Sequence, residues 1–414
     1  WTARAITSSS PASTTKPHAA ETTAPTGTLA PLPAPWIDKP QPGIQAITVR
    51  THPRDADTST PWKRWSRDGP NARSSRGVRG LDRPPATRHG ERRDIPEGLW
   101  PRSDHPPRVT LMASPLTMLP ARLLPRDRVV VVSPSSWPDS RADLDPLLDS
   151  LQSWGLRPEL GAHVVDRRGY MAGTDADRLT DLNQALRDPD VRAVIASTGG
   201  CGSLRLLRGV DQDALERDPK PLVGYSDITA LHQLWRRSGV PAVHGAVDGA
   251  HRDAVREQLM DAAPTLVRND PGAITAALTT TGRASGDLVG GNLEMLARTA
   301  GVVETSWQGC ILLLEANKAA GLGMVDRALA QLRLSGALDG ITGVAVGSFE
   351  EFAGYQDRGW TIVDTLHDLL DDLGVPILGG LPLGHLPDPV PVPLGVPAVL
   401  DADAGQLSVG ALVR

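Results

Sequence analysis

Apolar runs with the spacing of strands and of helices alternate through the middle of the chain. Residues 129–132 are four consecutive valines, which is typical of a strand covered on both faces. Leucines at helical spacing then predict one helix over 144–151 and a second over 179–186. Apolar runs at 191–196 and 222–223 predict two more strands. This alternation indicates an α/β layer built on a mainly parallel sheet.

The same alternation returns toward the end of the chain. Apolar runs at 311–314 and 344–346 predict buried strands, and leucines around 325–332 and 366–370 predict the helices that follow them. Two short strands are expected near 398–409. The sequence has no sustained internal repeat, so a second α/β unit is favoured over a solenoid.

The pattern divides the chain into four segments. We expect an α/β protein with an N-terminal domain over 118–248, which carries a doubly wound parallel sheet, and a smaller C-terminal α/β domain over 284–414. Residues 249–283 are less regular and are interpreted as a linker. Residues 1–117 keep neither a helical nor a strand period and are predicted to be a disordered extension.

The composition of the extension supports this prediction. It holds 18 of the 37 prolines, and residues 1–110 carry 17 Lys and Arg against 10 Asp and Glu. Such a segment could be a basic tail for acidic partners or a transit-like leader, although its prolines argue against an amphipathic leader helix. We favour an upstream extension with no selected fold, because the chain begins with Trp1 and Met118 stands just ahead of the first strand.

The overall composition narrows the class of protein. The 414 residues have a net charge of −5, which gives no general attraction to nucleic acid or to anionic membranes. No apolar run approaches the roughly 20 residues that cross a bilayer. Two cysteines, Cys201 and Cys310, form neither a disulfide framework nor a cysteine-rich zinc site, and no cluster has metal-ligand spacing. We therefore expect a cytoplasmic protein without a bound metal.

Candidate chemistry lies where the predicted strands end, because ligands of open α/β sheets gather at the carboxyl ends of the strands. Ser226 follows a short strand and a glycine and stands at the start of a helix, which is the position of a nucleophile in an elbow turn. The match is imperfect, since Ile228 replaces the glycine of the hydrolase pattern. The alternative is that Ser226 or Asp227 only caps the helix.

A glycine-rich loop, 198–203, follows the strand at 191–196. Its backbone could approach a ligand and offer amides to an oxyanion, or it could be a plain turn. It matches neither the dinucleotide fingerprint nor the P-loop. Cys201 within it could be a thiol nucleophile, but no histidine or lysine adjoins it in the sequence to activate the thiol, so a buried, inert cysteine is favoured.

An acid and a histidine complete a possible catalytic set. Glu315 ends a buried apolar run, where it could orient a histidine or pair with Arg327 or Lys318. His385 lies in a proline-rich loop and could be catalytic or a plain surface residue. Serine, acid and histidine in this chain order occur in hydrolases with an elbow nucleophile, although geometry and not order defines a triad.

His232 and His244 are interpreted as structural or close to the substrate.

Several blocks resemble the LD-carboxypeptidase family, the muramoyltetrapeptide carboxypeptidases, to which microcin C resistance peptidases are related. The blocks stand in family order from about residue 126 to 414 and read GYMAGTDADR at 169–178, GGCGSLRLL at 199–207, KPLVGYSDITALH at 220–232, HGA at 244–246, GGNL at 290–293, ILLLE at 311–315 and GHL at 384–386.

The resemblance implies a serine peptidase that removes a terminal D-amino acid from an L-centre in murein-type peptides, without a cofactor, and forms homodimers. It assigns the nucleophile to Ser226, the glutamate to Glu315 and the histidine to His385. The backbone amides of Asp227 and Gly200 would form the oxyanion hole. Residues expected to contact the peptide substrate are Gly199, Cys201, Ser135, His244 and Asn292.

Two departures from the family pattern concern the substrate. The family usually has an arginine before the glycine pair and an aromatic residue after it, whereas this chain has Thr198 and Cys201. Three alternatives stay open: a peptidase that cleaves peptidyl-nucleotide conjugates, a Cys201-dependent hydrolase on a glutamine-amidotransferase-like sheet, and a binding module that keeps the fold without turnover.

Overall fold

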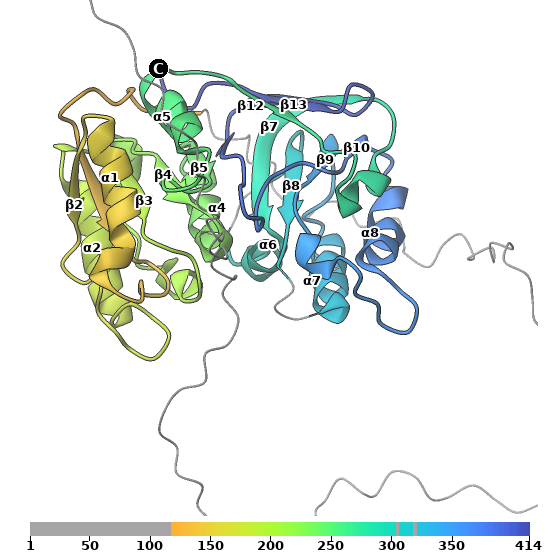
Figure 1. Ribbon diagram of the computed structural model, residues 1–414, viewed down its shortest axis with the longest axis horizontal. Coiled ribbons are helices and arrows are strands. Elements are labelled where there is room, and N and C mark those ends of the chain that lie inside the picture. The colour runs from red at the N-terminus through yellow and green to blue at the C-terminus, as the bar shows by residue number, and fades with distance from the viewer. Residues whose placement is uncertain (1–116, 304–305, 318–320) are drawn as a thin grey trace, which may run out of the picture. The chain divides into compact units, whose positions relative to one another are not determined.

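The computed structural model describes residues 117–303, 306–317 and 321–414. The extension predicted for residues 1–117 lies outside the described residues, except for Thr117. The described chain is built on two mixed β-sheets, each with helices packed against it (Figure 1). The predicted α/β class with two domains is confirmed, and each domain is built on one of the two sheets.

The first sheet has six strands in the order β11-β5-β4-β3-β1-β2. Five are parallel, as the buried apolar runs predict, but the sheet is mixed because β11 pairs antiparallel to β5. This last strand comes from the far end of the chain, which the sequence pattern did not indicate. The strands are β1 (Arg128–Val132), β2 (Arg157–Leu160), β3 (Val191–Ala196), β4 (Leu222–Gly224), β5 (Ala242–His244) and β11 (Val392–Leu394).

Helices cover both faces of the first sheet, as a doubly wound layer requires. One face packs against leucines and valines of α1 and α5, and the other packs against α2, α3 and α4. Thr174 and Asp177 form a capping box that starts α2. The helices are α1 (Asp145–Ser153), α2 (Asp175–Arg187), α3 (Gln212–Arg217), α4 (Thr229–Arg237) and α5 (Arg252–Met260), with 3₁₀ turns η1 (Arg141–Leu144), η2 (Ser203–Leu206) and η3 (Ser226–Ile228).

The second sheet has seven strands in the order β10-β9-β8-β7-β12-β13-β6. Its first four strands are parallel, and the remaining pairings are antiparallel. The strands are β6 (Thr265–Arg268), β7 (Arg283–Asn292), β8 (Ile311–Glu315), β9 (Gly343–Val346), β10 (Ile377–Leu378), β12 (Pro397–Asp401) and β13 (Gln406–Val409). Residues 249–283, which show no regular pattern in the sequence, therefore supply α5 and β6.

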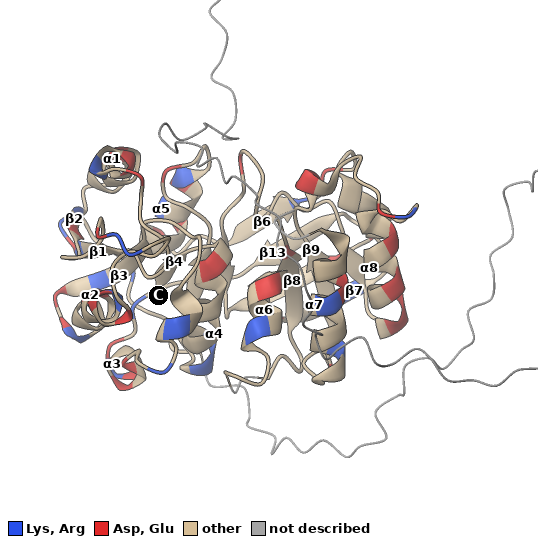
Figure 2. Cartoon of the chain, turned by 90° about the horizontal axis from the view of Figure 1, so that it is seen from below, with Lys and Arg blue, Asp and Glu red and all other residues tan. Residues whose placement is uncertain are grey.

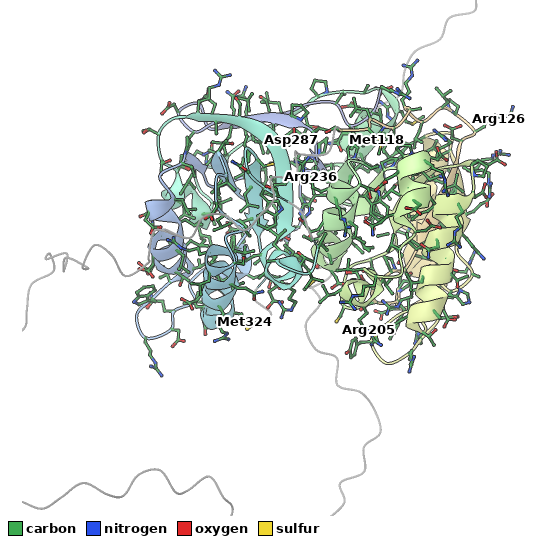
Figure 3. The ribbon with its side chains drawn as sticks, turned by 180° about the vertical axis from the view of Figure 1, so that it is seen from behind. Met118, Arg126, Arg205, Arg236, Asp287 and Met324 are labelled. Carbon is green, nitrogen blue, oxygen red and sulfur yellow. The ribbon has the colours of Figure 1, made fainter. Side chains whose placement is uncertain are left out.

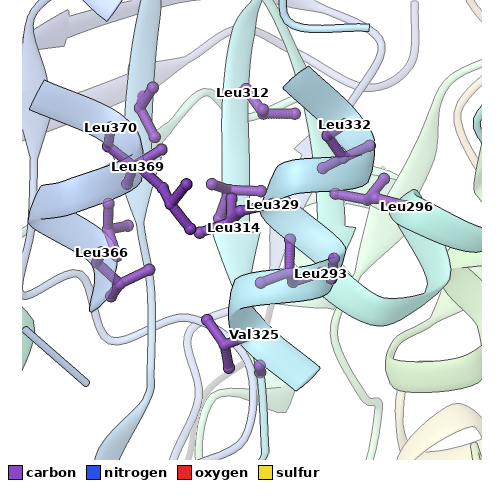
Figure 4. Packing of buried hydrophobic residues seen from close by; sticks show 14 of the residues in the cluster. Leu293, Leu296, Leu312, Leu314, Val325, Leu329, Leu332, Leu366, Leu369 and Leu370 are labelled. Atoms are coloured by element: carbon purple, nitrogen blue, oxygen red, sulfur yellow. The ribbon is translucent and has the colours of Figure 1, made fainter. Parts of the chain in front are cut away.

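Strand β8 is buried on both faces because its side chains alternate between two apolar clusters. Leu312 and Leu314 face the leucines of the helices (Figure 4). Ile311 and Leu313 point to the opposite face of the strand, where they belong to a second apolar cluster. The helices on this side are α6 (Leu293–Thr299), α7 (Leu322–Leu334) and α8 (Ile362–Leu370), with 3₁₀ turns η4 (Ile274–Leu278), η5 (Glu350–Phe352) and η6 (Asp371–Leu373).

The two domains are joined by a buried polar contact as well as by β11. Arg236 of α4 is 5% exposed, and its Nη1 lies 2.9 Å from Oδ2 of Asp287 on β7. Its Nη2 donates to Sγ of Cys310 at 3.5 Å. Figure 3 shows Arg236 and Asp287 close together where β7 passes α4. Because the guanidinium is paired, its charge can be held inside the junction.

Charged residues of both signs are spread over the outer helices, and acidic residues recur along α8 and the 3₁₀ turn η6 that follows it (Figure 2). Among the described residues, no helix combines the length and the apolar character that a membrane crossing requires.

Candidate active site

The chain makes a strained turn between β4 and α4. Tyr225 is extended, whereas Ser226 has a φ of 63°, one of few positive values at a residue other than glycine. Such a conformation costs on the order of 1–3 kcal/mol and persists only where the surroundings impose it. Neither Ser226 nor Asp227 supplies a side-chain cap to η3 or α4. The geometry is therefore that of an elbow and not of a helix cap.

His385 lies beside this turn, although it is 159 positions away along the chain. Its Nε2 is 3.0 Å from Oγ of Ser226. Its carbonyl oxygen accepts a hydrogen bond from Oγ of Ser348 at 2.7 Å, which holds the loop. Gly384 has a φ of 93°, and a Cβ there would lie 2.4 Å from Oε2 of Glu315. Only glycine therefore lets the loop bring His385 this close to the acid.

Glu315, the last residue of β8, is fully buried behind His385. Its Oε2 accepts from Nδ1 of His385 at 2.5 Å and from the backbone N–H of the same residue at 3.2 Å. Burial raises the pKa of Glu315, the hydrogen bonds and charge of His385 lower it, and the net pKa lies below its ordinary value. Burial lowers the pKa of His385, and the same contacts with Glu315 raise it above its ordinary value. Each group thus favours the charged form of the other.

The glycine loop lies directly against Ser226. A Cβ on Gly199 would lie 2.8 Å from Cβ and 3.2 Å from Oγ of Ser226. Gly200 is the next residue, and its N–H donates to no other described backbone or side-chain group. The N–H of Asp227 lies in the first turn after the nucleophile position. An oxyanion hole formed by these two amides stays a prediction.

The side chain of Asp227 connects the elbow to two neighbouring loops, a role that the sequence did not indicate. Its buried Oδ2 accepts from Oγ of Ser135 at 2.6 Å and from the N–H of Ser203 at 2.8 Å. Oγ of Ser203 donates in turn to the carbonyl of Asp227 at 2.6 Å. These bonds fix the elbow relative to the end of β1 and the end of the glycine loop.

The remaining candidate residues lie near this centre, but several are buried. Ser135 is fully buried, His244 is 1% exposed and Asn292 is 6% exposed. Asn292 caps α6 by accepting from the N–H of Met295 at 3.3 Å. Cys201 is exposed, so its expected burial is wrong, and its backbone N–H donates to Oγ of Ser136 at 3.1 Å. Their contact with a substrate stays a prediction.

The alternative ion pair for Glu315 is not formed with Arg327, whose Nη2 instead contacts Sδ of Met324 at 3.1 Å. Lys318 lies outside the described residues. Across the described part of the chain, no group of three or more His, Cys, Asp or Glu residues is arranged to hold a metal ion.

Family models match both halves of the described chain. The N-terminal domain model of LD-carboxypeptidase matches residues 129–245, and the C-terminal domain model matches residues 285–400. The chain belongs to the LD-carboxypeptidase family. Together the two matches span Ser226, Glu315 and His385, so the resemblance seen in the sequence motifs is confirmed.

Two bacterial proteins named as carboxypeptidases are similar to about two thirds of the chain. A carboxypeptidase-like protein of Streptomyces coelicolor is 40% identical over 304 residues, which cover 70% of this chain and 95% of that protein. The murein tetrapeptide carboxypeptidase of Pseudomonas aeruginosa is 32% identical over 290 residues, or 67% of this chain and 94% of that enzyme.

Two solved structures have a similar fold. The muramoyltetrapeptide carboxypeptidase of Oxalobacter formigenes is 27% identical with a TM-score of 0.60, over 69% of this chain and all of that one. A microcin C7 self-immunity protein in complex with aspartyl sulfamoyl adenosine has a TM-score of 0.62 at 24% identity, over 72% of this chain and all of that one.

Proposed function

We propose that this hydrolase of the LD-carboxypeptidase family is a serine carboxypeptidase with the catalytic set Ser226, His385 and Glu315. The observation that carries the proposal is the continuous hydrogen-bonded series from Oγ of Ser226 through the two ring nitrogens of His385 to Glu315. A nucleophile, a base and an acid that orients the base are the parts that acyl transfer needs.

The reaction begins when Oγ of Ser226 attacks the carbonyl carbon of the scissile amide and gives its proton to Nε2 of His385. Glu315 holds the other ring proton on Nδ1, so Nε2 is free to accept, and its charge stabilises the imidazolium that forms. The N–H groups of Asp227 and Gly200 would donate to the oxyanion, and each such donor contributes on the order of 3 kcal/mol.

The tetrahedral intermediate then collapses. The C–N bond breaks, Nε2 of His385 gives its proton to the leaving amine, and Ser226 remains as an acyl ester. A water molecule gives a proton to His385 as it attacks the ester carbon, and the second collapse returns the proton to Ser226. These residues complete the cycle without any further reacting group.

The proposed substrate is a murein-type peptide, from which the enzyme removes a terminal D-amino acid next to an L-centre. The support is that murein tetrapeptide is the substrate named for the relative from Pseudomonas aeruginosa, which is matched over 94% of its length. A homodimer is also proposed on the family resemblance, and sedimentation of the purified chain tests it.

Product analysis tests the proposed reaction. Murein tetrapeptide should lose its terminal D-residue, Ser226→Ala should abolish this release, and Cys201→Ala should retain it. A serine-reactive phosphonate should label Ser226 in the wild-type chain. An inactive cysteine variant beside an active serine variant would instead support a thiol hydrolase, and release only from acylated nucleotide conjugates would change the substrate class. An unlabelled chain without turnover would support a binding module.

A further inference from the structure

A second histidine lies beside the glutamate. His244 is the last residue of β5 and Glu315 is the last residue of β8, so the two come from different sheets. Nε2 of His244 lies 4.0 Å from Oε1 of Glu315, and the side chains are 1% and 0% exposed. The carboxylate thus has a histidine near each of its oxygens: His385 at Oε2 and His244 at Oε1.

The polar atoms that face each other here have no other partner among the described residues. Oε1 of Glu315 and both ring nitrogens of His244 are buried and make no hydrogen bond with a described group. A buried acceptor and a buried donor are costly to leave unpaired. Closing the 4.0 Å gap to hydrogen-bond length takes a shift of only about 1 Å, and apo active sites often show such long contacts.

The charge state of His244 suits it as a donor. Burial lowers its pKa, Glu315 raises it and His385 lowers it again, with a net shift downward. Burial also lowers the pKa of the neighbouring His232 to about 3, and the rings of these two histidines are 6.3 Å apart. Both rings are therefore neutral at neutral pH. A neutral imidazole has one N–H, and an ionised carboxylate only accepts, so the favourable tautomer has the proton on Nε2.

We propose that His244 is a positioning residue for the serine reaction, donating from Nε2 to Oε1 of Glu315. This bond holds the carboxylate with Oε2 toward His385, so that the base keeps its tautomer and its alignment with Ser226. The inference rests on the proposed catalytic set, and it gives His244 a role through Glu315 in place of the substrate contact that the resemblance implies, since its side chain is 1% exposed.

Two amide substitutions test the position of the donor. The side-chain N–H of His244→Gln can reach the region of Nε2, whereas that of His244→Asn lies near Nδ1. The readouts are the rate constant for labelling of Ser226 by a serine-reactive phosphonate, and kcat and KM for murein tetrapeptide. We expect His244→Asn to lower the labelling rate and kcat about 10- to 100-fold with KM nearly unchanged, since a misplacement of about 1 Å has effects of this size. His244→Gln should stay within about threefold of the wild type.

A matched control separates positioning from general damage to the domain junction. Gln233 is buried on α4, and its Oε1 accepts from Nε1 of Trp307 at 3.2 Å. Gln233→Leu removes one buried hydrogen bond and should lower the melting temperature without slowing the labelling. Should His244→Asn not fold, His244→Leu replaces it as a variant of similar volume without an N–H.

Three results would overturn the proposal: equal rates for the Gln and Asn variants, wild-type rates for both the Asn and the Leu variants, or an equal slowing by Gln233→Leu. The phosphonate reports the reactivity of Ser226 without a murein peptide. An error in the proposed substrate therefore leaves this comparison intact, whereas a wild-type chain that is not labelled at all would overturn both proposals.

Discussion

Two opposing effects set the protonation of His385. Burial lowers its pKa, but the hydrogen bond and the charge of Glu315 raise it by more, so the net pKa lies above 6.5. A general base must be neutral to accept the proton of Ser226. In the free enzyme, kcat/KM should therefore fall as the pH drops through this raised pKa.

Replacing the acid tests the sign of this effect. Glu315→Gln removes the group that raises the pKa of His385 and leaves the burial that lowers it, so the acid limb of the kcat/KM profile should move to lower pH. The value of kcat should fall by several orders of magnitude, because the amide also allows the wrong tautomer. The rate constant for labelling of Ser226 by the phosphonate, measured across the pH range, reports both the position of the acid limb and the loss of reactivity. An acid limb that stays in place or moves to higher pH would contradict the argument.

The hydrogen bond from Ser135 to Asp227 should matter for the oxyanion hole. Ser135→Ala removes one of the two hydrogen bonds that hold the carboxylate of Asp227. We expect kcat to fall about tenfold, since the backbone N–H of Asp227 is a proposed donor to the oxyanion. Ser133→Ala is the matched control, because Ser133 bonds to the carbonyl of Val164 and to Ser197 instead. Equal kcat values for the two variants would refute this role.

The sequence predicted some of these site residues but not all of their contacts. The motifs and chain order select Ser226, Glu315 and His385, and in the structure Ser226 and Glu315 each lie within hydrogen-bond distance of His385. For the carboxylate of Asp227 the sequence suggests only a helix cap, because its actual partner Ser135 lies 92 positions away. Contacts between distant loops leave no local pattern, so sequence reasoning had no signal for them.

At the scale of elements, apolar periodicity identified the strands whose side chains are large and buried. The span predicted for β3 is confirmed at 191–196, and β8 extends one residue further, to Glu315. Strand β7 was missed because three of its ten residues are glycines, which carry no apolar side chain. Strands β5 and β11 have three residues each, too few to show an alternation, and β11 contains a proline.

The packing of β8 against the helices should dominate the stability of the second domain. Leu314 is fully buried in the cluster of Figure 4, so Leu314→Ala should lower the free energy of unfolding by about 2–5 kcal/mol. Leu334 on α7 is 72% exposed, and Leu334→Ala should change it by less than about 0.5 kcal/mol. Denaturant unfolding of the two variants checks this, and similar losses would contradict the assignment of the core.

At the scale of the whole molecule, each sheet supplies part of the site. Ser226 follows β4 of the first sheet, Glu315 ends β8 of the second, and His385 lies in the loop that leads from β10 to β11. The site therefore depends on the arrangement of both domains, which the Arg236–Asp287 contact and β11 help to hold.

A chain that begins at Met118 should keep this arrangement. The backbone N–H of Met118 donates to the carbonyl of Gly239 at 2.7 Å, and an amino terminus there could make the same bond. Removing Thr117 costs one hydrogen bond to Gly395. We expect the melting temperature to stay within about 4 °C of the full chain, with kcat unchanged. Calorimetry and turnover of both forms provide the check, and a large drop in either would show that residues 1–117 contribute.

The late strand β11 also has a consequence for biosynthesis. The outer edge of β5 is complete at His244, but its partner ends only at Leu394, 150 positions later. At about 5–20 residues per second, a ribosome needs roughly 8–30 s to make that stretch. Throughout this interval β5 is an edge strand with unpaired N–H and C=O groups. Such edges can pair with other chains and lead to aggregation. Cells that make this protein would therefore need to shield β5 until translation is nearly finished.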